Sequence, residues 1–207
     1  MRFFEGPRLW IVIALALLPA AGGVLAINGT NEAAIRAVIR LTARTSLLLF
    51  LLAFTASAVA KLWPSALSRW QRRNRRPFGL AFAFSHFIHA IVIAWLARMG
   101  PTQAADALTP AMLIFGGFGY LCIIAMAATS WDGAIAFLGI RRWRLLHLIC
   151  GHYLWLQFMV SFGKRIPDAP AYIGFLAILS AAMAIRIAAM RVNPPDISPQ
   201  RAFSPKS

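Results

Sequence analysis

Acidic residues are scarce in this chain: six Asp and Glu occur among 207 residues, against 21 Lys and Arg, and the formal net charge is +15. The acids all lie outside the long apolar stretches or at their edges, at Glu5, Glu32, Asp106, Asp132, Asp168 and Asp196. The sequence therefore does not support paired-carboxylate catalysis or a carboxylate proton relay through an apolar region. We expect Asp132 to cap the short helix that ends before Gly139.

Cysteine is scarce too, and the motifs that it builds are missing. Cys122 and Cys150 both lie within apolar stretches and form no CxxC pair, so we expect packing residues and no disulfide. There is no GxGxxG motif and no internal repeat. The stretches between the apolar segments are short, and we expect no nucleotide-binding or flavin-binding module within the chain.

Apolar residues, by contrast, are abundant. Hydrophobic residues make up 60% of the chain and charged residues 13%, with a mean hydropathy of +0.69, which is typical of a membrane protein. A membrane-crossing helix needs about 20 apolar residues. Six such stretches occur, so we predict an all-α, six-transmembrane-helix bundle over residues 1–190 and a disordered cytoplasmic tail over 191–207. The predicted spans are Leu9–Ile27, Thr45–Trp63, Pro77–Ala97, Leu108–Ala128, Trp143–Phe162 and Ala169–Ala189.

The first span has an alternative interpretation as a signal peptide. Arg2 and Arg8 precede its apolar core, and Ala20–Ala26 is rich in small residues. Against this, the stretch is long for a cleaved signal, Glu5 lies in the region that should be basic, and cleavage would leave five helices. We therefore expect the first span to be retained.

The basic residues indicate the orientation. Fourteen Lys and Arg fall on one face of the predicted bundle and six on the other, so the positive-inside rule predicts that both termini are cytoplasmic. We expect a multi-pass protein of the inner (plasma) membrane and no nucleic-acid partner. The basic run Trp70–Arg76 is also compatible with a contact to anionic lipids.

The four histidines carry the functional signal. All lie within the third and fifth spans, at His86, His89, His147 and His152. An imidazole in hydrocarbon is costly unless it is paired or bound, and facing helices of a bundle can hold a metal or haem iron between them. A histidine near a helix end, such as His147 close to Arg144, has the simpler alternative of reaching interfacial water or a carbonyl. We predict a cofactor role for at least two of the four.

Helix geometry limits which histidines can act together. The third and fifth spans run parallel, and at about 1.5 Å per residue His147 lies roughly 5 Å into the membrane, His152 roughly 12 Å, His86 roughly 15 Å and His89 roughly 20 Å. His86 and His152 are therefore nearest in depth. His86 and His89 share a helix face, whereas His147 and His152 differ by about 140° and cannot point at one partner.

Several motifs around these histidines resemble a known family, the ferric reductase-like transmembrane domain. Asn74–Leu80 followed by Ser85–His89 is similar to its third helix, and Arg141–His147 ending in His152–Trp155 is similar to its fifth. The start of the second span, Thr42–Ser46, also fits a branch of this family. The family includes bacterial methionine sulfoxide reductase haem-binding subunits and the membrane cores of NADPH oxidases. The resemblance covers nearly the whole chain, and six spans with both termini inside is the topology it implies.

The resemblance implies histidines of the third and fifth helices that bind b-type haem and pass electrons across the membrane. In the family, each of these helices can carry two histidines, for an inner and an outer haem. Here His89 matches the outer ligand of the third helix, but the inner position falls near Arg75. His147 matches the inner ligand of the fifth helix, but the outer position falls at Val160. Two complete stacked sites cannot be built.

We therefore expect at most one haem b, bound noncovalently because there is no CxxCH motif. His89 is expected to matter most. For the opposite axial place, family position favours His147 and depth favours His152. We expect His152 for a single haem, because a bis-histidine iron needs ligands at nearly one level, and His86 is a further candidate. Arg44 is expected to pair a haem propionate, although the stripe formed by Arg36, Arg40 and Arg44 is equally compatible with an interfacial helix.

The sequence thus predicts an integral-membrane electron-transfer subunit of a transmembrane oxidoreductase system. A separate reductase or the quinone pool would supply electrons, and a separate acceptor would remove them. The rival interpretation is a haem-free membrane scaffold or assembly partner that keeps the same fold. The missing ligands favour this rival, and the clustering of all four histidines opposes it.

Overall fold

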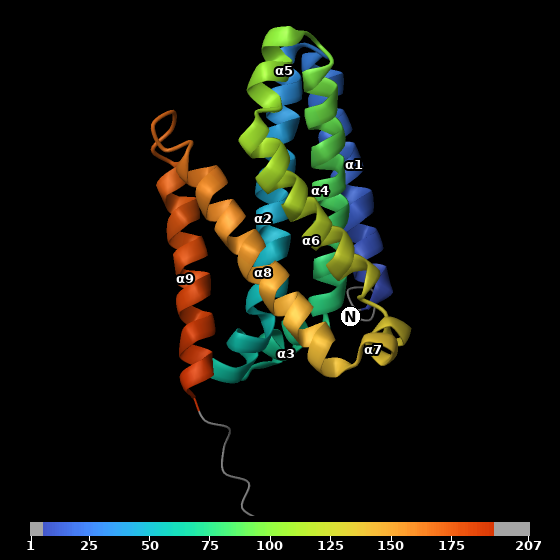
Figure 1. Cartoon of the computed structure of the whole chain (residues 1–207), viewed down its shortest axis with the longest axis vertical. Coiled ribbons are helices and arrows are strands. Elements are labelled where there is room, and N and C mark those ends of the chain that lie inside the picture. Colours follow the sequence, from blue (N-terminus) through green and yellow to red (C-terminus); the bar gives the residue numbers. More distant parts are fainter. Residues whose placement is uncertain (1–5, 193–207) are drawn as a thin grey trace, which may run out of the picture.

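The computed structural model describes residues 6–192, the side chains of Pro7, Asp106 and Ala107 excepted, and within this range the chain forms helices and no strands. The long helices stand side by side in a bundle (Figure 1). They are α1 (Pro7–Asn28), α2 (Glu32–Leu62), α4 (Arg75–Ala97), α8 (Ile140–Gly163) and α9 (Tyr172–Arg191). The predicted tail 191–207 lies outside the described residues beyond Val192.

Each of these five helices is long and apolar enough to cross a membrane, and they match five of the six predicted spans. The sixth candidate joins a π-helical turn (Met112–Gly116) to α6 (Gly117–Ala128) and is followed by α7 (Asp132–Leu138) after a bend of 104°. The prediction of an all-α transmembrane bundle is confirmed.

The second helix begins earlier than expected. It starts at Glu32 rather than Thr45, because Asn31 accepts a hydrogen bond from the backbone amide of Ala34 and caps it there. Arg36 pairs with Glu32 one turn away, at 2.7 Å. The arginine stripe is therefore part of α2 and not a separate helix on the membrane surface. At about 1.5 Å per residue, α2 exceeds the hydrocarbon thickness of about 30 Å.

The turn after α2 sets the position of the next helices. Pro64 cannot continue α2, and Ser65 and Ser68 then form a reciprocal capping box that starts α3 (Ala66–Arg73). Asn74, buried between α3 and α4, accepts a hydrogen bond from the backbone amide of Gly6 at 2.9 Å and donates to the Trp70 carbonyl at 2.9 Å. Asn74 thus ties the start of α1 to the junction of α3 and α4.

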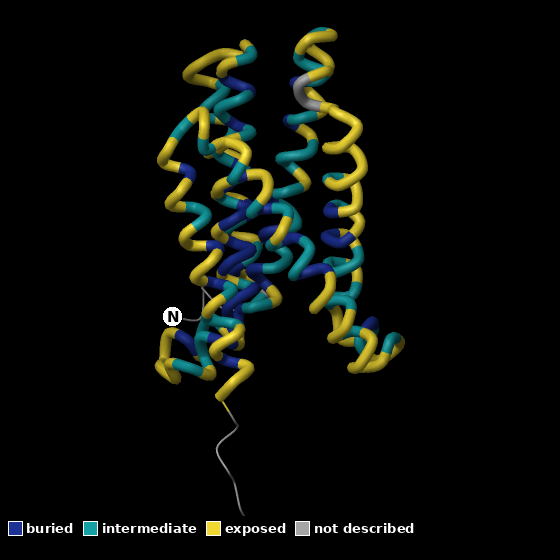
Figure 2. The backbone as a smooth tube through the Cα atoms, turned by 60° about the vertical axis from the view of Figure 1, so that its left-hand side comes forward, coloured by how far each residue is buried: buried dark blue, intermediate teal, exposed yellow. Residues whose placement is uncertain are grey.

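The buried core lies around α2. Apolar side chains of α2, α4, α8 and α9 meet there, and the buried residues gather toward the middle of the bundle in Figure 2. Aromatic rings of three helices form its centre, where Phe50 contacts Phe54, Phe82 and Phe158 at centroid distances of 5.0–5.5 Å. Many large apolar side chains on the outer surface are exposed, as expected for helices that face lipid.

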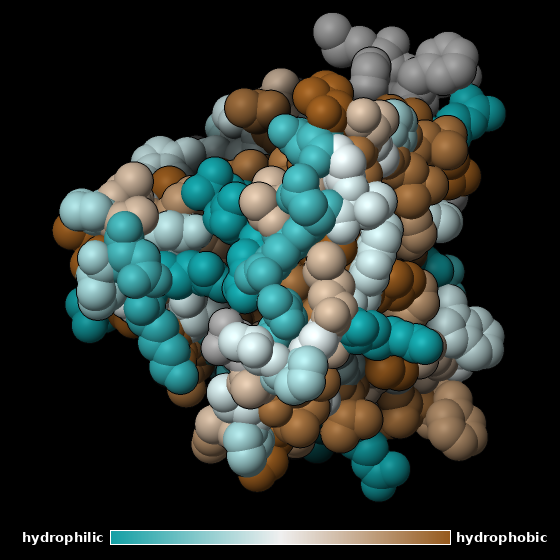
Figure 3. Space-filling model, turned by 90° about the horizontal axis from the view of Figure 1, so that it is seen from above, coloured by the Kyte–Doolittle hydropathy of each residue, from teal (hydrophilic) through white to brown (hydrophobic). Residues whose placement is uncertain are grey.

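The two ends of the bundle are polar. We call the end that carries α3, α7 and the start of α8 the basic end (Figure 1). The opposite end carries α5 (Pro101–Ala107), where Gln103 donates to Glu32 at 2.9 Å. Seen from above, hydrophilic side chains form a band across this opposite face, with hydrophobic ones beside it (Figure 3).

Two local contacts differ from, or extend, the sequence expectations. Asp132 is the first residue of α7 rather than its cap, since the capping position is Trp131 and no side chain caps it. The π-helical turn is held by Tyr153, whose hydroxyl donates to the Phe115 carbonyl at 2.6 Å.

Cys122 of α6 and Cys150 of α8 are both buried and carry free thiols.

Candidate functional site

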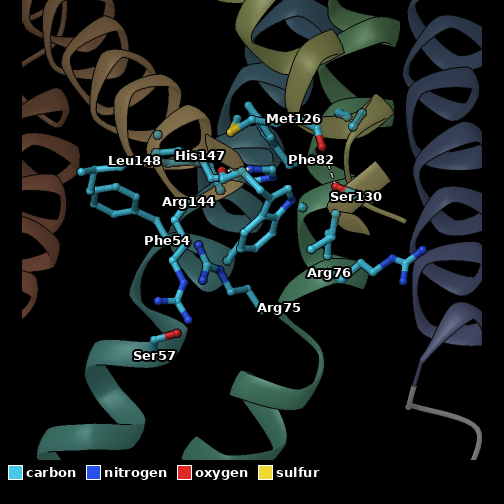
Figure 4. A pocket seen from close by; sticks show the side chains of 18 of the residues that line it. Phe54, Ser57, Arg75, Arg76, Phe82, Met126, Ser130, Arg144, His147 and Leu148 are labelled. Atoms are coloured by element: carbon cyan, nitrogen blue, oxygen red, sulfur yellow. Dashed lines mark hydrogen bonds between the residues drawn. The ribbon is translucent and has the colours of Figure 1, made fainter. Parts of the chain in front are cut away.

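A cavity of about 830 Å³ opens at the basic end of the bundle (Figure 4). Its walls come from α2, α3, α4, α6, α7, α8 and α9, so residues far apart in the sequence meet there. Its volume lies within the usual range for small-molecule and cofactor sites, about 300–1,000 Å³. Apolar and aromatic side chains such as Phe54, Phe82 and Met126 form its inner part.

The charges around this cavity are almost all positive. Among the described residues that line it, the one acid is Asp132, which lies on the surface and reaches Arg76 at 3.4 Å. In Figure 4, Arg76 points away from the cavity, whereas Arg75 and Arg144 extend into it below the His147 ring. Such a site favours an anionic ligand. The arginines that line it are Arg72, Arg73, Arg75, Arg76, Arg141, Arg144 and Arg186.

Of the four histidines, all of which the structure describes, His147 alone lines this cavity. Its Nδ1 lies 3.0 Å from the Trp143 carbonyl oxygen, and the centroids of the His147 and Trp143 rings are 4.3 Å apart. A carbonyl only accepts, so Nδ1 carries the hydrogen and Nε2 of the neutral ring keeps its lone pair. A supporting hydrogen bond of this kind is typical of metal-ligating histidines.

His86 and His89 lie together deeper in the bundle. Their rings stack at 5.1 Å. The rings of Phe82, Tyr120 and Phe158 surround His86 at 5.1–6.0 Å, and its buried Nδ1 has no hydrogen-bond partner within the described part of the chain. The space beside His86 that faces α8 is thus occupied by Phe158.

His89 is oriented by a hydroxyl of α2. Its Nδ1 lies 2.9 Å from Thr42 Oγ1, and the Thr42 hydroxyl is also within 2.9 Å of the Val38 carbonyl. Because the hydroxyl hydrogen goes to that carbonyl, Thr42 Oγ1 accepts from His89 Nδ1, and Nε2 of His89 keeps its lone pair.

His152 lies apart from the α4 histidines. Its ring contacts Phe54 of α2 at 5.6 Å, its Nδ1 bonds the Leu148 carbonyl at 2.7 Å, and no ring contact joins it to His86 or His89, all three being described residues. The residue of α8 that reaches His86 is Phe158, which is six residues, or about 9 Å, further along the helix. The sequence estimate assumed two upright helices, whereas α8 runs obliquely across the bundle (Figure 1).

Arg44 lies toward the end opposite the cavity. Its guanidinium is 5.8 Å from the Tyr172 ring and 5.7 Å from the Phe175 ring of α9. Ten residues, or about 15 Å of helix, separate it from Phe54 at the cavity wall. Arg44 is thus nearly level with Thr42 and His89 and remote from His147.

The sequence interpretation missed two features of the cavity. Arg186 was not among the predicted site residues, yet it lines the cavity, donates to the Phe54 carbonyl at 2.7 Å and lies 4.1 Å from the Phe54 ring centroid. Gly79 lines the cavity, and nothing lies within 4 Å of where a Cβ would be. A glycine two residues after Pro77 gave no pattern that would have revealed this open space.

Within residues 6–192, no three His, Cys, Asp or Glu side chains gather as a metal site.

The chain is similar to curated methionine sulfoxide reductase subunits. It is 34% identical over 121 residues to the protein-methionine-sulfoxide reductase heme-binding subunit MsrQ of Azospira oryzae, which covers 53% of this chain and 50% of the relative. It is 31% identical over 96 residues to MsrQ of Polaromonas naphthalenivorans, or 41% of this chain and 43% of the relative. These similarities confirm the resemblance seen in the motifs.

The alignments span about half the length of these curated relatives or somewhat less. No protein-family model matches the chain. No solved structure matches it significantly.

Proposed function

We propose that this chain is a haem b-binding membrane subunit that carries electrons for an oxidoreductase system. The observation that carries the proposal is the arginine-rich cavity of about 830 Å³ lined by His147, whose Nδ1 is held by the Trp143 carbonyl. The similarity to subunits named as haem-binding supports it. Haem, when bound, supplies one-electron redox chemistry.

The residues around the cavity fit this cofactor. His147 would bind the iron through Nε2, with the Trp143 carbonyl holding the ring in the required tautomer. The inner apolar wall would cover the porphyrin, and the arginines would balance its propionates. The geometry thus favours His147 over His152 as the ligand supplied by α8, because His152 faces Phe54 instead.

The proposal allows one haem in this cavity. Phe158 occupies the space between α8 and His86, so an outer haem between these helices would require that ring to move. His89 remains a candidate ligand by its position in the family pattern, and His86 remains one because it lies beside His89 on the same helix. In the present arrangement, Phe82 links the cavity to His86, and His86 contacts His89, so aromatic rings lead from the cavity toward the opposite end.

The proposed orientation determines which side of the membrane the cavity faces. If the basic end is cytoplasmic, as the distribution of Lys and Arg predicts, the cavity opens toward the cytoplasm. A reductase or the quinone pool would deliver electrons to the subunit, and an acceptor outside this chain would receive them.

Absorption spectra test the proposal. The protein, purified in detergent and supplied with haem, should show a Soret band and, after dithionite reduction, the α-band of a b-type haem. If no Soret band appears, the proposal is wrong, and a haem-free membrane scaffold is then the better interpretation. That rival has its own support in the occupied space beside His86.

A further inference from the structure

Arg186 of α9 is held in an unusual position inside the bundle. Its Nη1 donates to the Phe54 carbonyl of α2 at 2.7 Å, and its guanidinium stacks 4.1 Å from the centroid of the same residue's ring. Two contacts with one residue fix the plane of the guanidinium. Its Nε is buried and has no acceptor among the described residues.

A buried N–H without an acceptor is costly, especially on a charged group. The described residues around it provide no protein anion that could remove this cost. Arg186 lines the same cavity as Arg75 and Arg144, and the one acid among the described lining residues, Asp132, is 94% exposed and interacts with Arg76. Three arginines from α4, α8 and α9 therefore share a cavity in which the one acid among the described lining residues interacts with a different arginine, Arg76.

The shape of the free edge indicates the kind of anion. With Nη1 engaged by the Phe54 carbonyl, the Nε edge of the guanidinium is left for a second acceptor. A guanidinium edge binds a planar carboxylate through two parallel hydrogen bonds. We propose that Arg186, together with Arg75, forms a carboxylate clamp in this cavity that binds and orients a haem propionate. This inference rests on the proposed function.

A pair of ligands that differ only in the carboxylates tests the clamp. Haem and haem dimethyl ester are titrated into the haem-depleted protein in detergent, and the dissociation constant of each is measured from the Soret band. The wild-type protein should prefer the free acid. Arg186→Gln should reduce this preference about tenfold. Arg186→Lys keeps the charge but lacks the planar edge, so its preference for the free acid should lie between those of the wild type and Arg186→Gln.

Arg191→Gln is the matched control, because Arg191 lies on the same helix, is exposed and does not line the cavity. It should keep the wild-type preference. Circular dichroism and gel filtration of each variant show whether the fold is retained. If Arg186→Gln weakens haem and its dimethyl ester equally, Arg186 only supports the fold through Phe54, and the clamp is wrong. An unchanged preference in Arg186→Gln also overturns it.

Two further results distinguish the clamp from a lipid-phosphate site and from a failure of haem binding itself. If phosphatidylglycerol abolishes the preference of the wild-type protein for the free acid, a lipid phosphate occupies the arginines and the propionate assignment is wrong. If the wild-type protein binds neither ligand, the proposed haem function fails together with the clamp. If haem binds but Arg186 has no effect, the clamp alone fails.

Discussion

Thr42 of α2 and His89 of α4 are joined across the helix interface by a hydrogen bond of 2.9 Å between Oγ1 and Nδ1. The residues lie 47 positions apart in the sequence, and Thr42 is almost fully buried. Next to them, the buried hydroxyls of Ser46 and Ser85 are 2.9 Å apart. Polar side chains thus set the register of α2 against α4 within an apolar bundle, where lipid offers them no alternative partner.

Replacing Thr42 should therefore weaken the α2–α4 interface. Thr42→Val keeps the shape of the side chain but leaves His89 Nδ1 without its acceptor, and we expect a loss of about 1 kcal/mol in the free energy of unfolding. Thermal unfolding in detergent measures it. Thr45→Val is the control, because the Thr45 hydroxyl bonds the Leu41 carbonyl of its own helix. Equal losses in the two variants would contradict an interface role for Thr42.

The four histidines should differ in their effect on haem. His147→Ala removes the one histidine that lines the cavity, so we expect it to lose most of the haem per protein, while His152→Ala should keep it. Pyridine haemochromogen analysis of the purified variants measures this content. His89→Ala tests the ligand expected from the family pattern. Retention of haem by all four variants would show that the histidines are packing residues.

Because a single histidine lines the cavity, one axial position should be open to small ligands. We expect the reduced, haem-loaded protein to bind carbon monoxide, with a sharpened and shifted Soret band. A spectrum that does not respond to carbon monoxide would indicate a second strong ligand from the protein. His86 and His89 would then be the first residues to replace.

Filling the cavity should exclude the cofactor without unfolding the protein. Gly79 lies on the cavity wall and has nothing within 4 Å of the position that a Cβ would take, so Gly79→Phe should place its ring in the open space. We expect at least a tenfold weaker affinity for haem, or roughly 1.4 kcal/mol, and a nearly unchanged melting temperature. Gly174→Phe, on the outer part of α9 and away from the cavity, is the control. An equal loss of affinity in that control would point to a general effect on the bundle.

The orientation follows from the basic residues alone and can be tested separately. Reporter fusions at Asn74 and at Ser207 should both report the cytoplasm, and a fusion at Arg98 should report the opposite side. An opposite result at Asn74 would place the cavity on the outer side of the membrane.

The sequence predicted the helices better than the relations between them. Five spans were found from apolar composition, since a bilayer requires long uninterrupted helices. The early start of α2 was missed because Arg36 and its neighbours interrupt the apolar pattern, although Asn31 was a readable cap. The tilt of α8 depends on packing against several helices and leaves no periodic signal, so the depth comparison of His86 with His152 was misleading.

The direction of Arg186 was equally hidden in the sequence. An arginine near the end of an apolar helix usually extends toward the membrane surface. Here the carbonyl and ring of Phe54, 132 residues away in the chain, hold it inside the bundle. Such a contact can be recognised only when both helices are placed in three dimensions.

The π-helical turn at Met112–Gly116 makes the chain tolerant of losing one residue at this point. A π-turn contains one residue more than a regular α-helical turn, and Tyr153 of α8 binds a carbonyl within it. Deleting one residue there would restore a regular α-helical turn and leave the flanking segments nearly in phase, because a π-turn takes up one extra residue within a single turn. The side chains before the turn would then keep the faces that they present to their neighbours, so a single-residue deletion should change only the local contact with Tyr153 and should not rotate the preceding segment.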